Sequence, residues 1–118
     1  MSQLEHREPE PVAAADLMAE PGDTPGEWRL RVSGEVDVAS SPALRARIGE
    51  LLDQGAERVV LDLHELTFID SSGLGVLVGA LKRLQELGRQ DFVLAGLHGP
   101  PRRVFEITGL TQLFSIEP

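Results

Sequence analysis

The sequence of 118 residues contains no cysteine, which excludes a disulfide framework, a thiol nucleophile and a thiolate metal site. No stretch approaches the roughly 20 apolar residues that a membrane-spanning helix needs. Residues 1–9 contain no apolar core, so they do not have the pattern of a signal peptide. These absences predict a soluble, cytoplasmic protein, and the length fits one domain.

Positive charge is also scarce, since lysine occurs only at Lys82 and the net charge is −8. Residues 1–27 hold seven acids and one arginine, so they carry −6 of this charge and leave −2 for residues 28–118. There is no basic stripe, and only 4% of the residues are aromatic, so direct nucleic-acid binding is not expected. The acidic, proline-rich residues 1–11 predict a disordered lead-in, and residues 12–118 the domain itself.

The hydrophobic pattern predicts the element order ββαβαβαβ. Residues 58–63 are apolar at nearly every position, which is typical of a central strand covered on both faces. Helices that alternate with such strands favour parallel pairing through right-handed crossovers, with the first two strands paired antiparallel. We therefore predict an α/β sandwich with a mixed, mainly parallel sheet of about four to five strands. The expected strands span residues 12–19, 28–33, 58–63, 92–95 and 113–116, and the expected helices span residues 41–54, 72–87 and 99–107.

Three polar residues in a row, Asp70, Ser71 and Ser72, lie where a strand gives way to a helix. The N–H groups at a helix start lack partners and carry the positive end of the helix dipole. A serine there can cap the helix, hold an anion or be phosphorylated at an exposed tip. Capping needs only one such side chain. A cap does not require the glycines that follow at positions 73 and 75. Because Gly73 and Gly75 lack a Cβ, we expect them to leave the backbone open to another molecule. At the first predicted helix, Ser40 or Ser41 is the expected cap, and the expected buried face consists of Leu44, Ile48, Leu51 and Leu52.

A nucleotide site is disfavoured by the spacing of the glycines. Gly73, Gly75 and Gly79 form G-x-G-x-x-x-G, whereas the dinucleotide fingerprint is G-x-G-x-x-G. A P-loop lysine is missing too, because Lys82 lies deep in the predicted helix. We expect Gly75 and Gly79 to let this helix pack closely on the sheet.

The sequence offers little support for a serine hydrolase or for a metal site. The nucleophile-elbow pattern G-x-S-x-G is absent at Ser71, and no residue is clearly placed as its base, although His64 and His98 are available. The histidines have no partner at ligand spacing. Asp62 could meet Asp37 and Asp70 at one end of the sheet, but such an acidic rim is usually only solvated.

Residues 68–75, Phe-Ile-Asp-Ser-Ser-Gly-Leu-Gly, resemble the signature of STAS domains, specifically of bacterial anti-sigma factor antagonists. The resemblance extends over about residues 25–116 in the expected order. Four segments carry the resemblance. They are similar to the family's strand with the G-E-x-D turn (residues 30–37), central strand (residues 59–63), switch loop (residues 66–76) and closing segment (residues 101–113).

The resemblance implies a regulatory binding protein without cofactors, not an enzyme. Ser71 would be phosphorylated by the anti-sigma factor, a serine kinase with an ATPase-like fold. The unphosphorylated form would bind that kinase and release its sigma factor, and a metal-dependent serine phosphatase would restore this form. The residues expected at the partner surface are Asp37, Asp70, Ser71, Ser72, Gly73 and Leu74, with Ser72 acting as a cap or shaping the loop. The alternative is a structural STAS module of a signalling scaffold or a transporter-associated complex.

Overall fold

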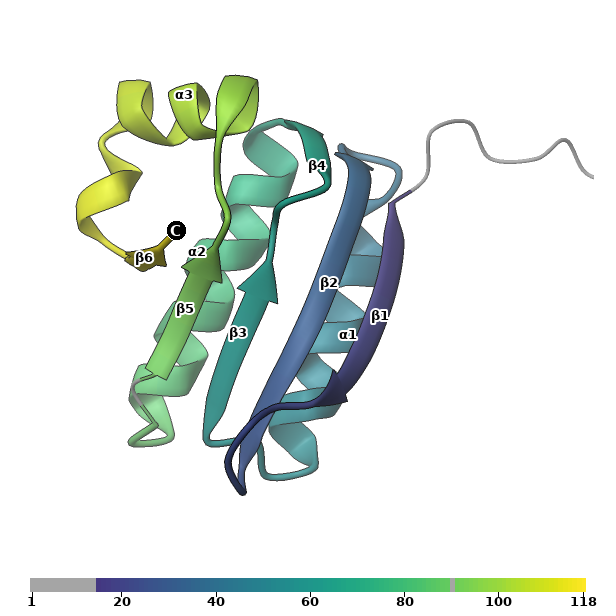
Figure 1. Cartoon of the computed structure of the whole chain (residues 1–118), viewed down its shortest axis with the longest axis vertical. Coiled ribbons are helices and arrows are strands. Elements are labelled where there is room, and N and C mark those ends of the chain that lie inside the picture. Colours follow the sequence, from purple (N-terminus) through teal and green to yellow (C-terminus); the bar gives the residue numbers. More distant parts are fainter. Residues whose placement is uncertain (1–14, 90) are drawn as a thin grey trace, which may run out of the picture.

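A computed structural model describes residues 15–89 and 91–118, so the predicted lead-in over residues 1–11 lies outside the described residues. Its helices and strands confirm the α/β class (Figure 1). In chain order they are β1 Asp16–Pro21, β2 Glu27–Val36, α1 Ser41–Asp53, β3 Arg58–Asp62, β4 Leu66–Ile69, α2 Ser71–Glu86, β5 Asp91–Ala95, α3 Gly99–Thr108 and β6 Ser115–Glu117, with a 3₁₀ turn over Leu110–Gln112 before β6.

The sheet is mixed and mainly parallel, as predicted. Its strands run in the order β1-β2-β3-β5-β6, and the remaining strand, β4, pairs with the end of β2. Only β1 and β2 pair antiparallel among the described strands, while the other pairs are parallel. With β4 the sheet has 6 strands, one more than the predicted order allowed. The pattern missed β4 because its two buried residues, Leu66 and Ile69, are three positions apart and show no period of two.

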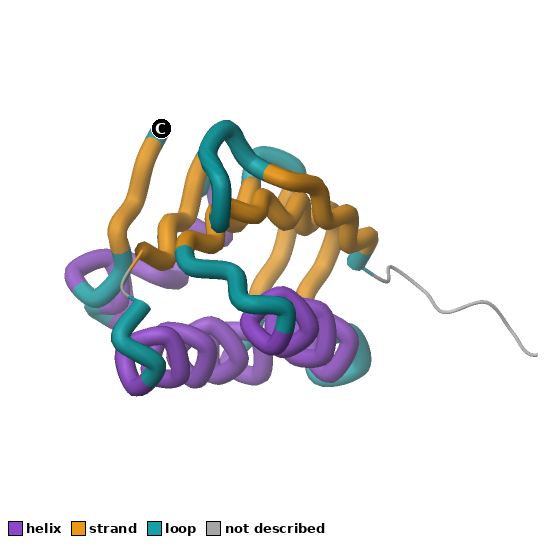
Figure 2. Tube along the Cα trace, turned by 90° about the horizontal axis from the view of Figure 1, so that it is seen from below, coloured by secondary structure: helices purple, strands orange, loops and turns teal. Residues whose placement is uncertain are grey.

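Helices α1 and α2 lie side by side on one face of the sheet (Figure 2). Leucines at the centres of three adjacent strands, Leu30, Leu61 and Leu94, are completely buried beneath them. Burying one such side chain stabilises the fold by about 1.5–3 kcal/mol. The predicted buried face of α1 is confirmed, and its residues are Leu44, Ile48, Leu51 and Leu52.

The opposite face of the sheet carries charge instead of helices. The Arg58 guanidinium lies 3.5 Å from Glu27, 3.6 Å from Asp91 and 3.5 Å from Glu117, and so it links four strands. Helices α1 and α2 follow β2 and β4 in the chain, so both begin at the carboxyl ends of parallel strands. The polar residues that the sequence singles out lie at that end.

Candidate functional site

The site lies where the neighbouring strands β2 and β4 both end. Val36 and Ile69 are paired in the parallel register, and an aspartate follows each of them directly in the chain. The backbone N–H of Asp70 donates to the carbonyl oxygen of Val36 at 3.1 Å. The fold thus brings the backbones of Asp37 and Asp70 to neighbouring strand ends, although 33 positions separate them in the sequence.

Asp70 is the N-cap of α2. Its backbone is extended, and its Oδ1 accepts hydrogen bonds from the N–H groups of Ser72 at 2.9 Å and Gly73 at 3.2 Å. The expectation that Ser72 caps the helix is therefore wrong, because a cap must lie outside the helical turn and Ser72 lies inside it. Ser71 becomes the first residue of the helix. Its side chain is exposed, and its hydroxyl has no hydrogen-bond partner in the part of the chain that the structure describes.

A tight turn after β2 is closed by Asp37. Its Oδ1 accepts from the N–H groups of Ala39 and Ser40, both at 3.0 Å. The hydroxyl of Ser40 donates to the Glu35 carbonyl oxygen at 2.8 Å and accepts from the N–H of Asp37 at 3.0 Å. Ser40 stands at the N-cap position of α1 as predicted, but this hydroxyl is used within the turn and makes no capping bond. The hydrogen bond from the Ser40 backbone is the main cause that lowers the pKa of Asp37.

Two exposed apolar side chains lie close to the aspartates in the chain, and neither was predicted from the sequence to belong to a binding surface. Val38, directly after Asp37, is 74% exposed, and Phe68, two residues before Asp70, is 45% exposed. Val38 could have been recognised, since it lies in a polar turn that offers an apolar side chain no core position. We refer to these residues and Ser71, which lie at or next to the carboxyl ends of β2 and β4, as the switch surface: Asp37, Val38, Phe68, Asp70 and Ser71.

Gly73 supports this surface from below. A Cβ at position 73 would lie 2.7 Å from the Cγ1 atoms of both Ile69 and Val36, closer than real Cβ atoms approach other atoms. Gly73 is therefore needed for packing within the domain. The expectation that it leaves the backbone open to another molecule is wrong. Leu74 is only 8% exposed and points into the core. Neither residue presents a side chain to a partner.

The other two glycines of the motif region behave in the opposite way. Gly75 and Gly79 are exposed, and a Cβ at either position would meet no atom within 4 Å. The expectation that they let the helix pack closely on the sheet is wrong, because they lie on the side of α2 that faces solvent.

The third aspartate of the predicted rim is separate from this surface. Asp62, at the end of β3, has its Oδ1 2.6 Å from His64 Nδ1, and its Oδ2 lies 3.8 Å from the Arg29 guanidinium. Burial raises the pKa of Asp62, but the hydrogen bonds from His64 and the positive charge of Arg29 outweigh it, so the pKa lies below its usual value. No hydrogen bond joins His64 to Ser71 in the described ranges. Nor do the described residues include a group of three or more side chains that could hold a metal ion.

Comparison with known proteins decides the family. The model of the STAS domain matches residues 23–118. The chain belongs to the STAS domain family. This STAS domain is 36% identical over 88 residues to the anti-sigma-B factor antagonist of Bacillus subtilis (strain 168), a match that covers 75% of this chain and 79% of the relative.

Solved structures with the same fold agree. An anti-sigma factor antagonist from Mycobacterium paratuberculosis matches with a TM-score of 0.78 and 30% identity, over 89% of this chain and 86% of that one. The anti-sigma factor antagonist SpoIIAA in its unphosphorylated form matches with a TM-score of 0.70 and 27% identity, over 87% of each chain. SpoIIAA of Bacillus in its phosphorylated form matches with a TM-score of 0.64 and 27% identity, over 87% of this chain and 90% of that one.

These relatives are regulatory binding proteins rather than enzymes, which agrees with the prediction for this STAS domain. The predicted family and fold are confirmed. No helix within the described ranges is both long and apolar enough to span a bilayer.

Proposed function

We propose that this STAS domain is an anti-sigma factor antagonist whose binding is switched off by phosphorylation of Ser71. In the unphosphorylated form, the switch surface binds an anti-sigma factor serine kinase, which then releases its sigma factor. The observation that carries the proposal is the Ser71 hydroxyl, which is exposed and has no hydrogen-bond partner among the described residues, at the first residue of α2 and directly after Asp70. The existence of a solved relative in both unphosphorylated and phosphorylated forms supports it.

The phosphate would be compatible with the fold. Transfer of the γ-phosphoryl group of ATP joins phosphorus to the Ser71 oxygen, releases ADP and passes the hydroxyl proton to a base of the kinase. The product adds a charge of about −1.5 to −2 at neutral pH. The first turn of a helix tolerates an anion, because its free N–H groups and the helix dipole favour negative charge. We therefore expect the phosphorylated domain to stay folded.

The same phosphate would not be compatible with a partner fitted to the unmodified surface. That surface carries two carboxylates, from Asp37 and Asp70, beside a neutral hydroxyl and two apolar side chains. A partner that matches this pattern has no further cation for a dianion. Burial of such a charge without a counter-charge costs several kcal/mol, and so weakens binding by about a hundredfold or more. The switch is then a local block of the interface.

Each residue has a distinct role in this proposal. Val38 and Phe68 supply the apolar contact area, and Ser71 carries the switchable charge. Asp37 and Asp70 hold the turn and the helix start in place and flank the serine. A metal-dependent serine phosphatase removes the phosphate, and the cytoplasm is the compartment in which ATP, kinase and sigma factor meet.

Affinity capture from a lysate of the source bacterium tests the proposal. Wild type and Ser71→Ala should capture an ATPase-fold serine kinase, whereas Ser71→Glu should capture several-fold less of it. Gln85→Glu is the matched control, because it adds the same charge at an exposed position near the far end of α2. When Mg-ATP is added to the wild-type complex, the phosphate should be found on Ser71.

Two results would overturn the proposal. Equal capture of the kinase by Ser71→Glu and wild type would remove the switch from Ser71. Equal capture of scaffold or transporter subunits by all four proteins, without a kinase, would favour the structural module instead.

A further inference from the structure

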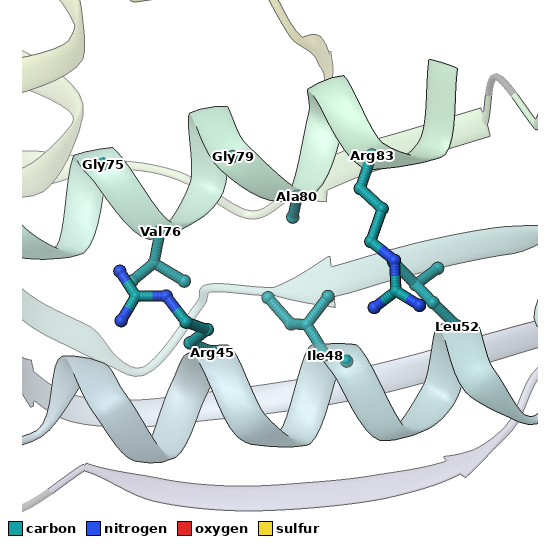
Figure 3. A pocket seen from close by; sticks show the side chains of 9 residues that line it. Arg45, Ile48, Leu52, Gly75, Val76, Gly79, Ala80 and Arg83 are labelled. Carbon is teal, nitrogen blue, oxygen red and sulfur yellow. The ribbon is translucent and has the colours of Figure 1, made fainter. Parts of the chain in front are cut away.

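A solvent-open groove runs between α1 and α2 and begins at Gly75, one helical turn beyond Ser71 (Figure 3). Its volume is about 310 Å³. This is at the lower end of the range for small-molecule sites, about 300–1,000 Å³. Apolar residues from both helices form its floor and are at most 9% exposed: Ile48, Leu52, Val76 and Ala80.

The two ends of the groove differ in charge. At one end, Arg83 of α2 lies 2.6 Å from Asp53 of α1, so its charge is paired and the two helices are linked. At the other end, Arg45 of α1 is exposed and forms no ion pair with any of the residues that the structure describes. Figure 3 shows both guanidinium groups reaching into the space between the helices. The groove therefore offers one unpaired cation beside an apolar floor.

Glycines keep this groove open. Gly75 and Gly79 line it on α2, and a Cβ at either position would meet no atom of the domain within 4 Å. Glycine inside a helix lowers stability relative to alanine. Packing within the domain gives no reason for this loss, because the space beyond each glycine is empty. The two glycines leave space beside α2 that no atom of the domain fills.

We propose that the groove binds a free monocarboxylic acid with an unbranched aliphatic chain. The carboxylate would accept hydrogen bonds from the Arg45 guanidinium, and the aliphatic chain would cover the apolar floor toward the Arg83–Asp53 pair. A groove of 310 Å³ holds about ten heavy atoms, if each takes about 30 Å³ as a water molecule does in the liquid. Octanoate has that size. The site goes beyond the proposed function, and its test is separate because octanoate binding is measured without a kinase and without a phosphate on Ser71.

Titration of the full chain with sodium octanoate, followed by amide NMR spectra, tests the site. We expect saturable shifts confined to α1 and α2. Octylamine has the same chain with the opposite charge, and it should bind about tenfold more weakly, since the guanidinium repels it.

Two variants with matched controls locate the ligand. Arg45→Gln should weaken octanoate binding about fivefold or more, whereas Lys82→Gln, at an exposed site outside the groove, should not. Gly79→Leu fills the groove and should abolish saturable binding, whereas Gln85→Leu on the same helix should leave it intact. The proposal is overturned if octanoate causes no saturable shifts, if octylamine binds equally well, or if Arg45→Gln binds like wild type.

Discussion

Asp37 and Asp70 make the same pair of hydrogen bonds at adjacent strand ends. In each case Oδ1 accepts from the backbone N–H groups two and three residues later, at Ala39 and Ser40 for Asp37 and at Ser72 and Gly73 for Asp70. The hydrogen bonds to Asp37 close the turn after β2, and those to Asp70 cap the start of α2. Both carboxylates are thereby held in place by hydrogen bonds within the domain, at the ends of two paired strands.

Removal of the helix cap should reduce stability. Asp70→Ala leaves the N–H groups of Ser72 and Gly73 without their acceptor, and we expect the free energy of unfolding to fall by about 1 kcal/mol. Ser72→Ala should change it by less than about 0.5 kcal/mol, because Ser72 caps nothing. Urea unfolding of the two variants measures both values, and equal losses would contradict the assignment of the cap.

Alanine at two glycines of α2 should have opposite effects. Gly73→Ala places a Cβ 2.7 Å from Ile69 and Val36, and should destabilise the domain by about 1–3 kcal/mol. Gly79→Ala meets no atom and should stabilise it by about 0.5–1 kcal/mol through helix propensity. Thermal or urea denaturation gives the sign of each change, and a loss at position 79 would show that the open space is needed for folding.

Acid should destabilise the domain through Asp37 and Asp62. Both have a pKa lowered in the folded state. Their contribution is therefore present above the pKa of the unfolded chain, near pH 4, and is lost as the pH falls through the lower folded pKa. The Asp62→Asn variant should lose less stability than wild type between about pH 5 and pH 2. Denaturation midpoints across this range test the prediction, and identical acid losses would count against the role of the His64–Asp62 pair.

A charge at Ser71 should leave the domain folded. Ser71→Glu places a carboxylate in the first turn of α2, where the helix dipole favours negative charge. We expect its circular dichroism spectrum to match that of wild type and its free energy of unfolding to be unchanged or slightly higher. A lost fold would mean that phosphorylation acts by unfolding and not by blocking an interface.

The sequence was sufficient to predict the helices and strands that have a clear hydrophobic period. Leu44, Ile48 and Leu52 identified the buried face of α1, and the apolar run over residues 58–63 identified β3. The expected parallel strands also predicted that Asp37 and Asp70 could meet at one end of the sheet, although Asp62, expected there too, is separate. These features depend on neighbours along the chain or on the general rules for parallel sheets.

The features that were wrong or missing depend on neighbours across the fold. Gly73 is required by the side chains of Val36 and Ile69, and Val36 is far from it in the sequence. β4 forms because the end of β2 offers a parallel partner, although its own four residues lack a strand period. A polar triplet at a helix start does not reveal which member is the cap, since that depends on the residue at which the helical conformation begins.

The most direct test is the dissociation constant of the purified anti-sigma factor kinase for two forms of the full chain, unmodified and phosphorylated at Ser71. We expect phosphorylation to raise this constant by about a hundredfold or more while the circular dichroism spectrum stays the same. Equal dissociation constants for the two forms would contradict it.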